Sequence, residues 1–155
     1  MIDVDIQLVI VANAAIAAFC GVLIGLDREL ADKPAGIKTH SLVAAAAALV
    51  VGVGRVINDT FGEGDPTRAL HAVITGIGFL GAGVIYTRAR FDRISGITTA
   101  ATIFFTAAVG VSVGLGAQVV GLIATAMALL ILRVVPLLER RLPDATDRKP
   151  LSKDQ

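Results

Sequence analysis

The feature that most constrains this chain is a run of 39 residues without a charge, from 94 to 132. As one helix it would extend about 58 Å, because an α-helix rises about 1.5 Å per residue. The hydrocarbon core of a bilayer is only about 30 Å thick. Three glycines near the middle, Gly110, Gly114 and Gly116, predict a turn. The run is therefore predicted to cross a membrane twice, over 95–113 and 117–138.

Three more apolar segments precede this run, at 6–26, 41–57 and 69–87. The first has 21 residues without a charge, enough for a helix to span the hydrocarbon core. Only 17% of the chain is charged, against about 25% in a soluble domain, and the mean hydropathy is +0.77. We therefore predict an all-α integral membrane protein, a compact bundle of five transmembrane helices with the lipid bilayer as its surroundings.

Lysine and arginine are unevenly distributed among the predicted loops. They occur in the first loop, the third loop and the C-terminal tail, whereas the second loop is acidic, with Asp59, Glu63 and Asp65. The positive-inside rule then predicts an N-terminus outside and a C-terminus in the cytoplasm. Residues 1–142 are expected to form the transmembrane domain, and the polar segment 143–155 a disordered cytoplasmic tail.

The stretch GIGFLG has the G-x-G-x-x-G spacing of dinucleotide-binding turns. That fold needs a strand before the glycines and a soluble sheet around them. Because these glycines lie within a predicted span, we expect no dinucleotide, and the net charge of +1 gives no indication of nucleic acid as a partner.

Glycines in the first and third spans predict close helix packing, because they let backbones approach. The alternative for the third span is a locally unwound segment lining a substrate path. Helix surfaces made of such small residues also predict a homo-oligomer, most simply a two-fold dimer. The predicted packing residues are Gly21, Gly25, Gly76, Gly78, Gly81 and Gly83.

A polar stripe is predicted on the fourth span. Ser95, Thr99, Thr102 and Thr106 are spaced four, three and four residues apart, which places them on one helix face. Asn13 of the first span is expected to face the stripe. The hydroxyls either bond to helix carbonyls or line a path for water or ions.

Charged and polar residues gather where the first span ends and the second begins, which we interpret as a functional cluster at the cytoplasmic mouth. Asp27 and Arg28 point about 100° apart on a helix, so one is expected to face the bundle and the other the headgroups. Either the charges pair and anchor the helix, or Asp27 turns inward and forms with Glu29 a Mg²⁺-responsive or partner-contacting site. The predicted cluster comprises Asp27, Arg28, Glu29, Lys38, Thr39 and His40.

At the outer mouth, Asp65 is expected to cap the third helix, with Arg68 in its first turn. The alternative is that Asp65 helps to gather cations, since hard ions prefer oxygen ligands. No nucleophile, catalytic triad or zinc spacing is present in the sequence, so we do not expect an enzyme. No cofactor is predicted other than the Mg²⁺ of the Asp27–Glu29 alternative.

Four ordered segments carry a family resemblance: GVLIGLDREL, PAGIKTHSLV, DPTRALHAVITGIGFLGAGVI and SGITTAATIFFTAAVGVSVGLG. Together they resemble the membrane domain of the MgtC/SapB family. The resemblance implies an inner-membrane protein of a bacterium or archaeon, tied to magnesium limitation and in some pathogens to survival inside macrophages. The chain departs from the family pattern at His71 and Phe104 and lacks the soluble C-terminal domain of longer members.

The resemblance implies a role in magnesium homeostasis, with two alternatives. One is a regulator or partner of another membrane complex such as the F-type ATP synthase. The other is a transporter or channel for Mg²⁺ or another cation. Transporters usually place acidic groups within the membrane, and the carboxylates here lie at or beyond the span ends, which favours the regulator.

Overall fold

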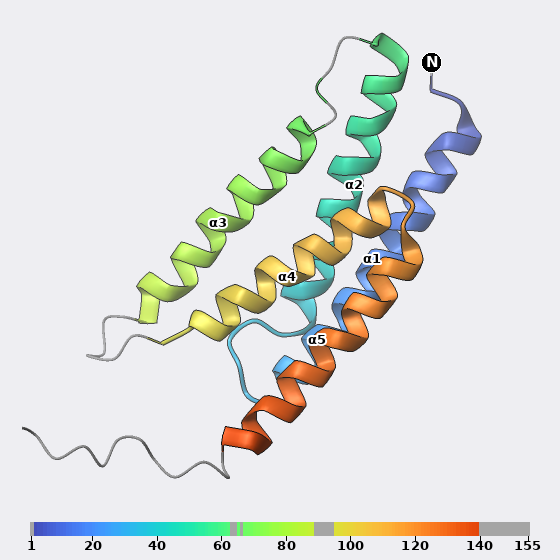
Figure 1. The fold of residues 1–155 in the computed structure, drawn as a ribbon. Coiled ribbons are helices and arrows are strands. Elements are labelled where there is room, and N and C mark those ends of the chain that lie inside the picture. Colours follow the sequence, from blue (N-terminus) through green and yellow to red (C-terminus); the bar gives the residue numbers. More distant parts are fainter. Residues whose placement is uncertain (1, 63–64, 66, 89–94, 140–155) are drawn as a thin grey trace, which may run out of the picture.

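The computed structural model describes residues 2–62, 65, 67–88 and 95–139, and all regular structure in these ranges is α-helical. Five helices follow one another: α1 Val4–Leu30, α2 Ile37–Phe61, α3 Arg68–Arg88, α4 Ile97–Gly114 and α5 Gln118–Glu139. Each is long and apolar enough to cross a membrane. The start of α1 and the end of α5 lie at opposite ends of the bundle (Figure 1). The five-helix membrane bundle predicted from the sequence is confirmed.

The two ends of the bundle are named here by one acidic residue each. The Asp65 end holds the start of α1, the α2–α3 connection and the α4–α5 turn. The Asp27 end holds the α1–α2 connection, the start of α4 and the end of α5. The predicted tail, 143–155, lies outside the described residues.

The turn within the long uncharged run has the predicted length of three residues and lies one residue further along the chain than predicted. α4 continues to Gly114, and the chain reverses over three residues before α5 begins. Gly116 has a φ of +88°, a left-handed conformation that favours glycine, whereas Gly110 and Gly114 lie within α4. Only the last of the three glycines therefore makes the turn.

Gly110 and Gly114 instead let α4 approach α2. A Cβ added at Gly114 would lie 2.6 Å from the carbonyl oxygen of Ala48, and one at Gly110 would collide with Ala44. α1 approaches the same helix through Gly21 and Gly25, where a Cβ at Gly25 would lie 2.6 Å from Cα of Ile37. Backbone-to-backbone contact on small residues thus joins α1, α2 and α4.

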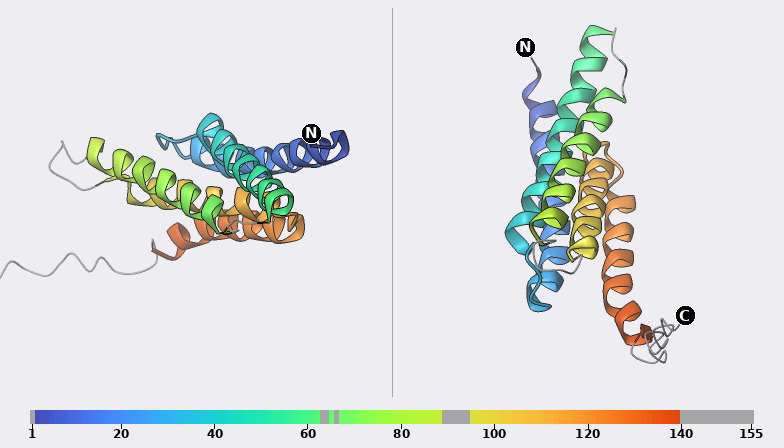
Figure 2. Two further views of the ribbon diagram at one scale, coloured as in Figure 1. Left: turned by 90° about the horizontal axis from the view of Figure 1, so that it is seen from above. Right: turned by 90° about the vertical axis from the view of Figure 1, so that its left-hand side faces the viewer.

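α4 contacts all four other helices, whereas α3 lies at the side of the bundle (Figure 2). α3 packs inward through Ile77, Val73 and Val84 rather than through its glycines. The prediction that its glycines pack within the chain is corrected here. Gly81 lies in ordinary contact with Ala100, at 3.6 Å, but a Cβ added at Gly76, Gly78 or Gly83 would meet no atom within 4 Å. α3 is also helical throughout, so the unwound alternative is not seen.

Orientation in the membrane remains a prediction, tested with reporter fusions. A periplasmic reporter such as alkaline phosphatase should be active at the N-terminus and after Gly64, and inactive after Lys33, Arg90 and Gln155, because the basic loops are expected to stay in the cytoplasm. A cytoplasmic reporter at the same positions serves as the control. The reverse pattern would contradict the predicted orientation.

Candidate functional site: a cationic cavity at the Asp27 end

The α1–α2 connection is held by the side chain of Glu29. Its Oε2 accepts a hydrogen bond of 2.9 Å from the backbone N–H of Ile37, the first residue of α2. The N-cap position is Gly36, which offers no side chain of its own, so the glutamate substitutes for a capping residue. This contact explains why α2 begins four residues before the predicted span. Nearby, Lys38 is exposed and Thr39 is half-buried.

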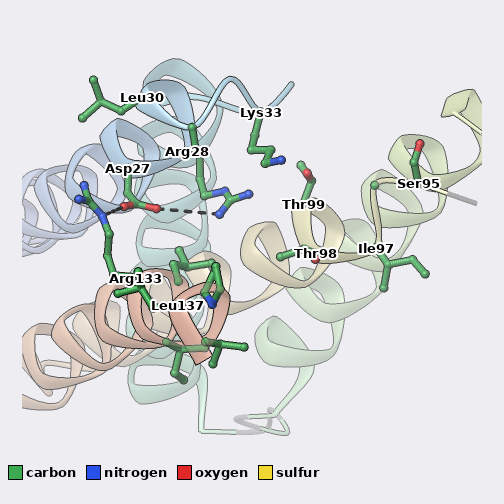
Figure 3. Close-up of a pocket in the computed structure, with 16 residues that line it drawn as sticks. Asp27, Arg28, Leu30, Lys33, Ser95, Ile97, Thr98, Thr99, Arg133 and Leu137 are labelled. Carbon is green, nitrogen blue, oxygen red and sulfur yellow. Dashed lines mark hydrogen bonds and ion pairs between the residues drawn. The ribbon is translucent and has the colours of Figure 1, made fainter. Parts of the chain in front are cut away.

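Asp27 and Arg28 are both buried, with exposed fractions of 6% and 5%. The Arg133 Nε of α5 donates to Asp27 Oδ1, and Arg28 Nη1 lies 3.9 Å from Asp27 Oδ2 (Figure 3). The prediction that one of the two residues reaches the headgroups is therefore wrong. α4 and α5 both pack against α1, and Arg133 of α5 reaches Asp27.

The Asp27–Glu29 metal site is not formed within this chain. Residues two apart on a helix do not face each other, and here the two carboxylates have different partners. Asp27 faces Arg133, whereas the exposed Glu29 accepts from Ile37. Among the described residues, no group of three or more His, Cys, Asp or Glu side chains could hold a metal ion.

Arg133 is the residue of this site that sequence reasoning missed. It lies within the fifth predicted span, 117–138, where it ends the long uncharged run. A lone arginine inside a predicted span is itself a signal, because intramembrane charges usually have a partner. Its side chain is 66% exposed, and its Nε links α5 to buried Asp27.

A cavity of about 1080 Å³ opens beside this ion pair, between the end of α1, the start of α4 and the second half of α5. Among the described residues that line it, three side chains are basic, Arg28, Lys33 and Arg133, and one is a carboxylate, Asp27, which gives these residues a formal excess of two positive charges. The α5 wall is apolar, with Ile131, Leu132, Val135 and Leu137. The site is thus a cationic cavity whose α5 side is largely apolar.

His40 is fully buried at the first turns of α2. Its Nδ1 lies 3.0 Å from the carbonyl oxygen of Gly36, so this nitrogen carries the proton of the hydrogen bond. Its Nε2 is buried and has no partner among the described residues. The backbone of His40 packs against Gly21 of α1, so this residue belongs to the helix contact and does not line the cavity.

The threonine stripe of α4 is buried and internally bonded. Thr102 Oγ1 donates to the Thr99 carbonyl and Thr106 Oγ1 to the Thr102 carbonyl, both at 2.8 Å. Half-buried Ser95 precedes the helix and lines the cavity. Asn13 does not bond to the stripe, because its Oδ1 accepts from Gln118 Nε2 at 2.9 Å. Of the two alternatives, these bonds favour hydroxyls satisfied by their own helix.

At the opposite end, Asp65 organises the start of α3. Its Oδ1 accepts from the hydroxyl and the backbone N–H of Thr67, at 2.7 and 2.8 Å. These two hydrogen bonds, the hydroxyl first, lower the pKa of the Asp65 carboxyl below its usual value. The carboxylate therefore accepts hydrogen bonds from Thr67, the residue just before α3. Arg68 is exposed in the first turn of the helix.

Five apolar helices, with charged groups near their ends, define a multi-pass membrane protein. Residues 15–141 match the MgtC family, and the chain belongs to this family. The family and its bacterial relatives place this multi-pass protein in the bacterial inner membrane.

Three relatives share about two fifths of their aligned residues with the chain. An uncharacterized protein of Haemophilus influenzae is 39% identical over 86% of this chain, and the putative magnesium transporter YhiD of Escherichia coli is 40% identical over 83%. Protein SrpB of Synechococcus elongatus is 40% identical over 81% of this chain and 74% of its own length. The chain spans only 58% and 60% of the Haemophilus and Escherichia relatives. No solved structure matches.

Proposed function

We propose that this chain is a membrane regulator of magnesium homeostasis that binds another membrane complex, and that it neither carries Mg²⁺ across the membrane nor catalyses a reaction. The magnesium role is supported by the family and by the printed name of the relative YhiD. The F-type ATP synthase is the candidate complex that the family resemblance implies. A two-fold dimer remains part of the proposal, with the exposed glycines Gly76 and Gly78 where a second copy would approach.

The observation that carries this proposal is the charge of the cavity at the Asp27 end. A hard divalent cation prefers a site rich in oxygen ligands and negative charge. Of the described lining residues, Asp27 alone is a carboxylate; it already faces Arg133 and Arg28, and Lys33 adds a third cation. Mg²⁺ entering this cavity would be repelled by the excess positive charge.

Polar groups deeper in the bundle also favour a regulator. A transport path needs side chains that exchange their partners for an ion or for water. The hydroxyls of Thr102, Thr106 and Thr125 all donate to carbonyls of their own helices. Asn13 and Gln118 bond to each other across α1 and α5. These polar groups therefore already have hydrogen-bond partners within the bundle.

A flux measurement separates the two alternatives. Purified chain in liposomes that enclose a fluorescent Mg²⁺ indicator should give no more Mg²⁺ entry than protein-free liposomes, because cations are repelled at the cavity and find no continuous polar path. A known magnesium channel reconstituted at the same density is the positive control. Sustained entry that depends on this chain would refute the regulator and favour the transporter.

A further inference from the structure

The start of α4 forms one side of the cationic cavity. Its N-cap residue is Gly96, in a left-handed conformation with a φ of 92°, and no side chain caps the helix. The first backbone N–H groups of a helix have no partner within it, and they carry partial positive charge. Ile97, Thr98 and Thr99, which hold these groups, line the cavity. The N-terminus of this 18-residue helix thus faces the same cavity as the basic side chains.

Arg28 supplies a second, independent indication of a ligand. Its side chain is 6% exposed, and its Nε is buried without an acceptor among the described residues. Its Nη1 lies 3.9 Å from Asp27 Oδ2, beyond hydrogen-bond distance, and Asp27 Oδ1 is bonded to Arg133. A buried guanidinium nitrogen without an acceptor is costly, so Arg28 is suited to an acceptor that comes from outside the described residues.

The geometry points to that acceptor being an anion held inside the cavity. Figure 3 shows the Arg28 guanidinium and the Lys33 amino group directed toward the first turn of α4, near Thr99. A guanidinium, an ammonium group and helix N–H groups converge there from two helices and a loop. We propose that the cavity binds the phosphate group of a phosphorylated ligand, either free phosphate or the headgroup of an anionic phospholipid.

Phosphate fits this donor set better than a carboxylate does. Its several acceptor oxygens point in different directions, so it can accept from a guanidinium fork, from an ammonium and from a helix N-terminus at once. The apolar α5 wall, including exposed Val135 and Leu137, would suit the acyl chain of a lipid, and basic pockets between membrane helices commonly bind anionic headgroups. This inference goes beyond the proposed function and does not depend on it.

Titration calorimetry in a maltoside detergent free of phosphate tests the shared chemistry. Inorganic phosphate and a short-chain phosphatidylglycerol are titrated separately into the delipidated protein. We expect at least one to bind, and Arg28→Gln to weaken that binding by roughly tenfold to a hundredfold, as the loss of a charge-assisted hydrogen bond implies. Lys33→Gln, at an exposed position where folding is not at stake, should weaken it less. Lys38→Gln, which does not line the cavity, is the matched control.

A third titration, with a short-chain phosphatidylcholine, is compared with these two to distinguish the sources of the phosphate group. Tighter binding of inorganic phosphate indicates a soluble ligand, and tighter binding of phosphatidylglycerol than of phosphatidylcholine indicates an anionic lipid. Either result supports the site, provided that Lys33→Gln or a folded Arg28→Gln weakens it. Absence of binding by the parent protein, or equal binding by Lys33→Gln, Lys38→Gln and any folded Arg28→Gln, would overturn the proposal.

Discussion

Gly25→Leu is expected to prevent the formation of the native bundle. Even a Cβ at this position would lie 2.6 Å from Cα of Ile37 and 2.8 Å from the carbonyl oxygen of Gly36, and neither backbone atom can move as a flexible side chain would. Overpacking usually destabilises a protein by about 1–3 kcal/mol. A clash with backbone atoms is expected to cost at least the upper value of this range. Separation of α1 from α2 would also break the Glu29 contact that begins α2. The yield of monodisperse protein and its unfolding temperature in detergent measure the effect.

Gly76→Leu is the matched control for this substitution. It makes the same change within a helix, but a Cβ there meets no atom of the chain within 4 Å, so the bundle should fold normally. If a second copy packs on this face of α3, the variant should instead lower self-association in mild detergent. Equal loss of folded protein in Gly25→Leu and Gly76→Leu would contradict the α1–α2 packing described above.

The helices could be predicted from the sequence because lipid imposes a simple length rule on apolar segments. The same rule cannot say which glycines face another helix. Gly21 and Gly25 pack in the chain, whereas Gly76 and Gly78, in a span richer in glycine, do not. Hydropathy is nearly the same for a residue that faces lipid and one that faces a helix, so burial is decided by tertiary packing.

The site was predicted only in part, for a related reason. The cluster at the end of the first span was found from its charges, but the partner of Asp27 is Arg133, 106 residues further along the chain. Loop lengths bring the start of α2 next to the end of α1, whereas nothing local in the sequence indicates that α5 covers this end. α5 supplies both the partner of Asp27 and one wall of the cavity.

Asp27→Asn is expected to abolish support of growth in low magnesium, in a host that lacks its own MgtC-family protein. The substitution keeps the shape of the side chain but removes the carboxylate that faces Arg133 and Arg28. Loss of one partner from a buried ion pair costs about 3–5 kcal/mol, and the exposure of Arg133 places this case toward the lower limit. Complementation at limiting magnesium and the amount of the variant in the membrane are measured together.

A second substitution separates a structural role of Asp27 from a functional one. Arg28→Gln combined with Asp27→Asn removes the buried positive charge as well, so stability should recover largely, because the remaining cation, Arg133, is 66% exposed and no uncompensated ion stays buried. If Asp27 acts on a partner, the double variant should be stable and present in the membrane yet still fail to support growth. Arg28→Gln alone shows whether that failure comes from the loss of Arg28, because it keeps the Asp27–Arg133 pair. If Asp27→Asn alone folds and supports growth as well as the parent does, Asp27 is an anchor of α5 and has no functional contact of its own.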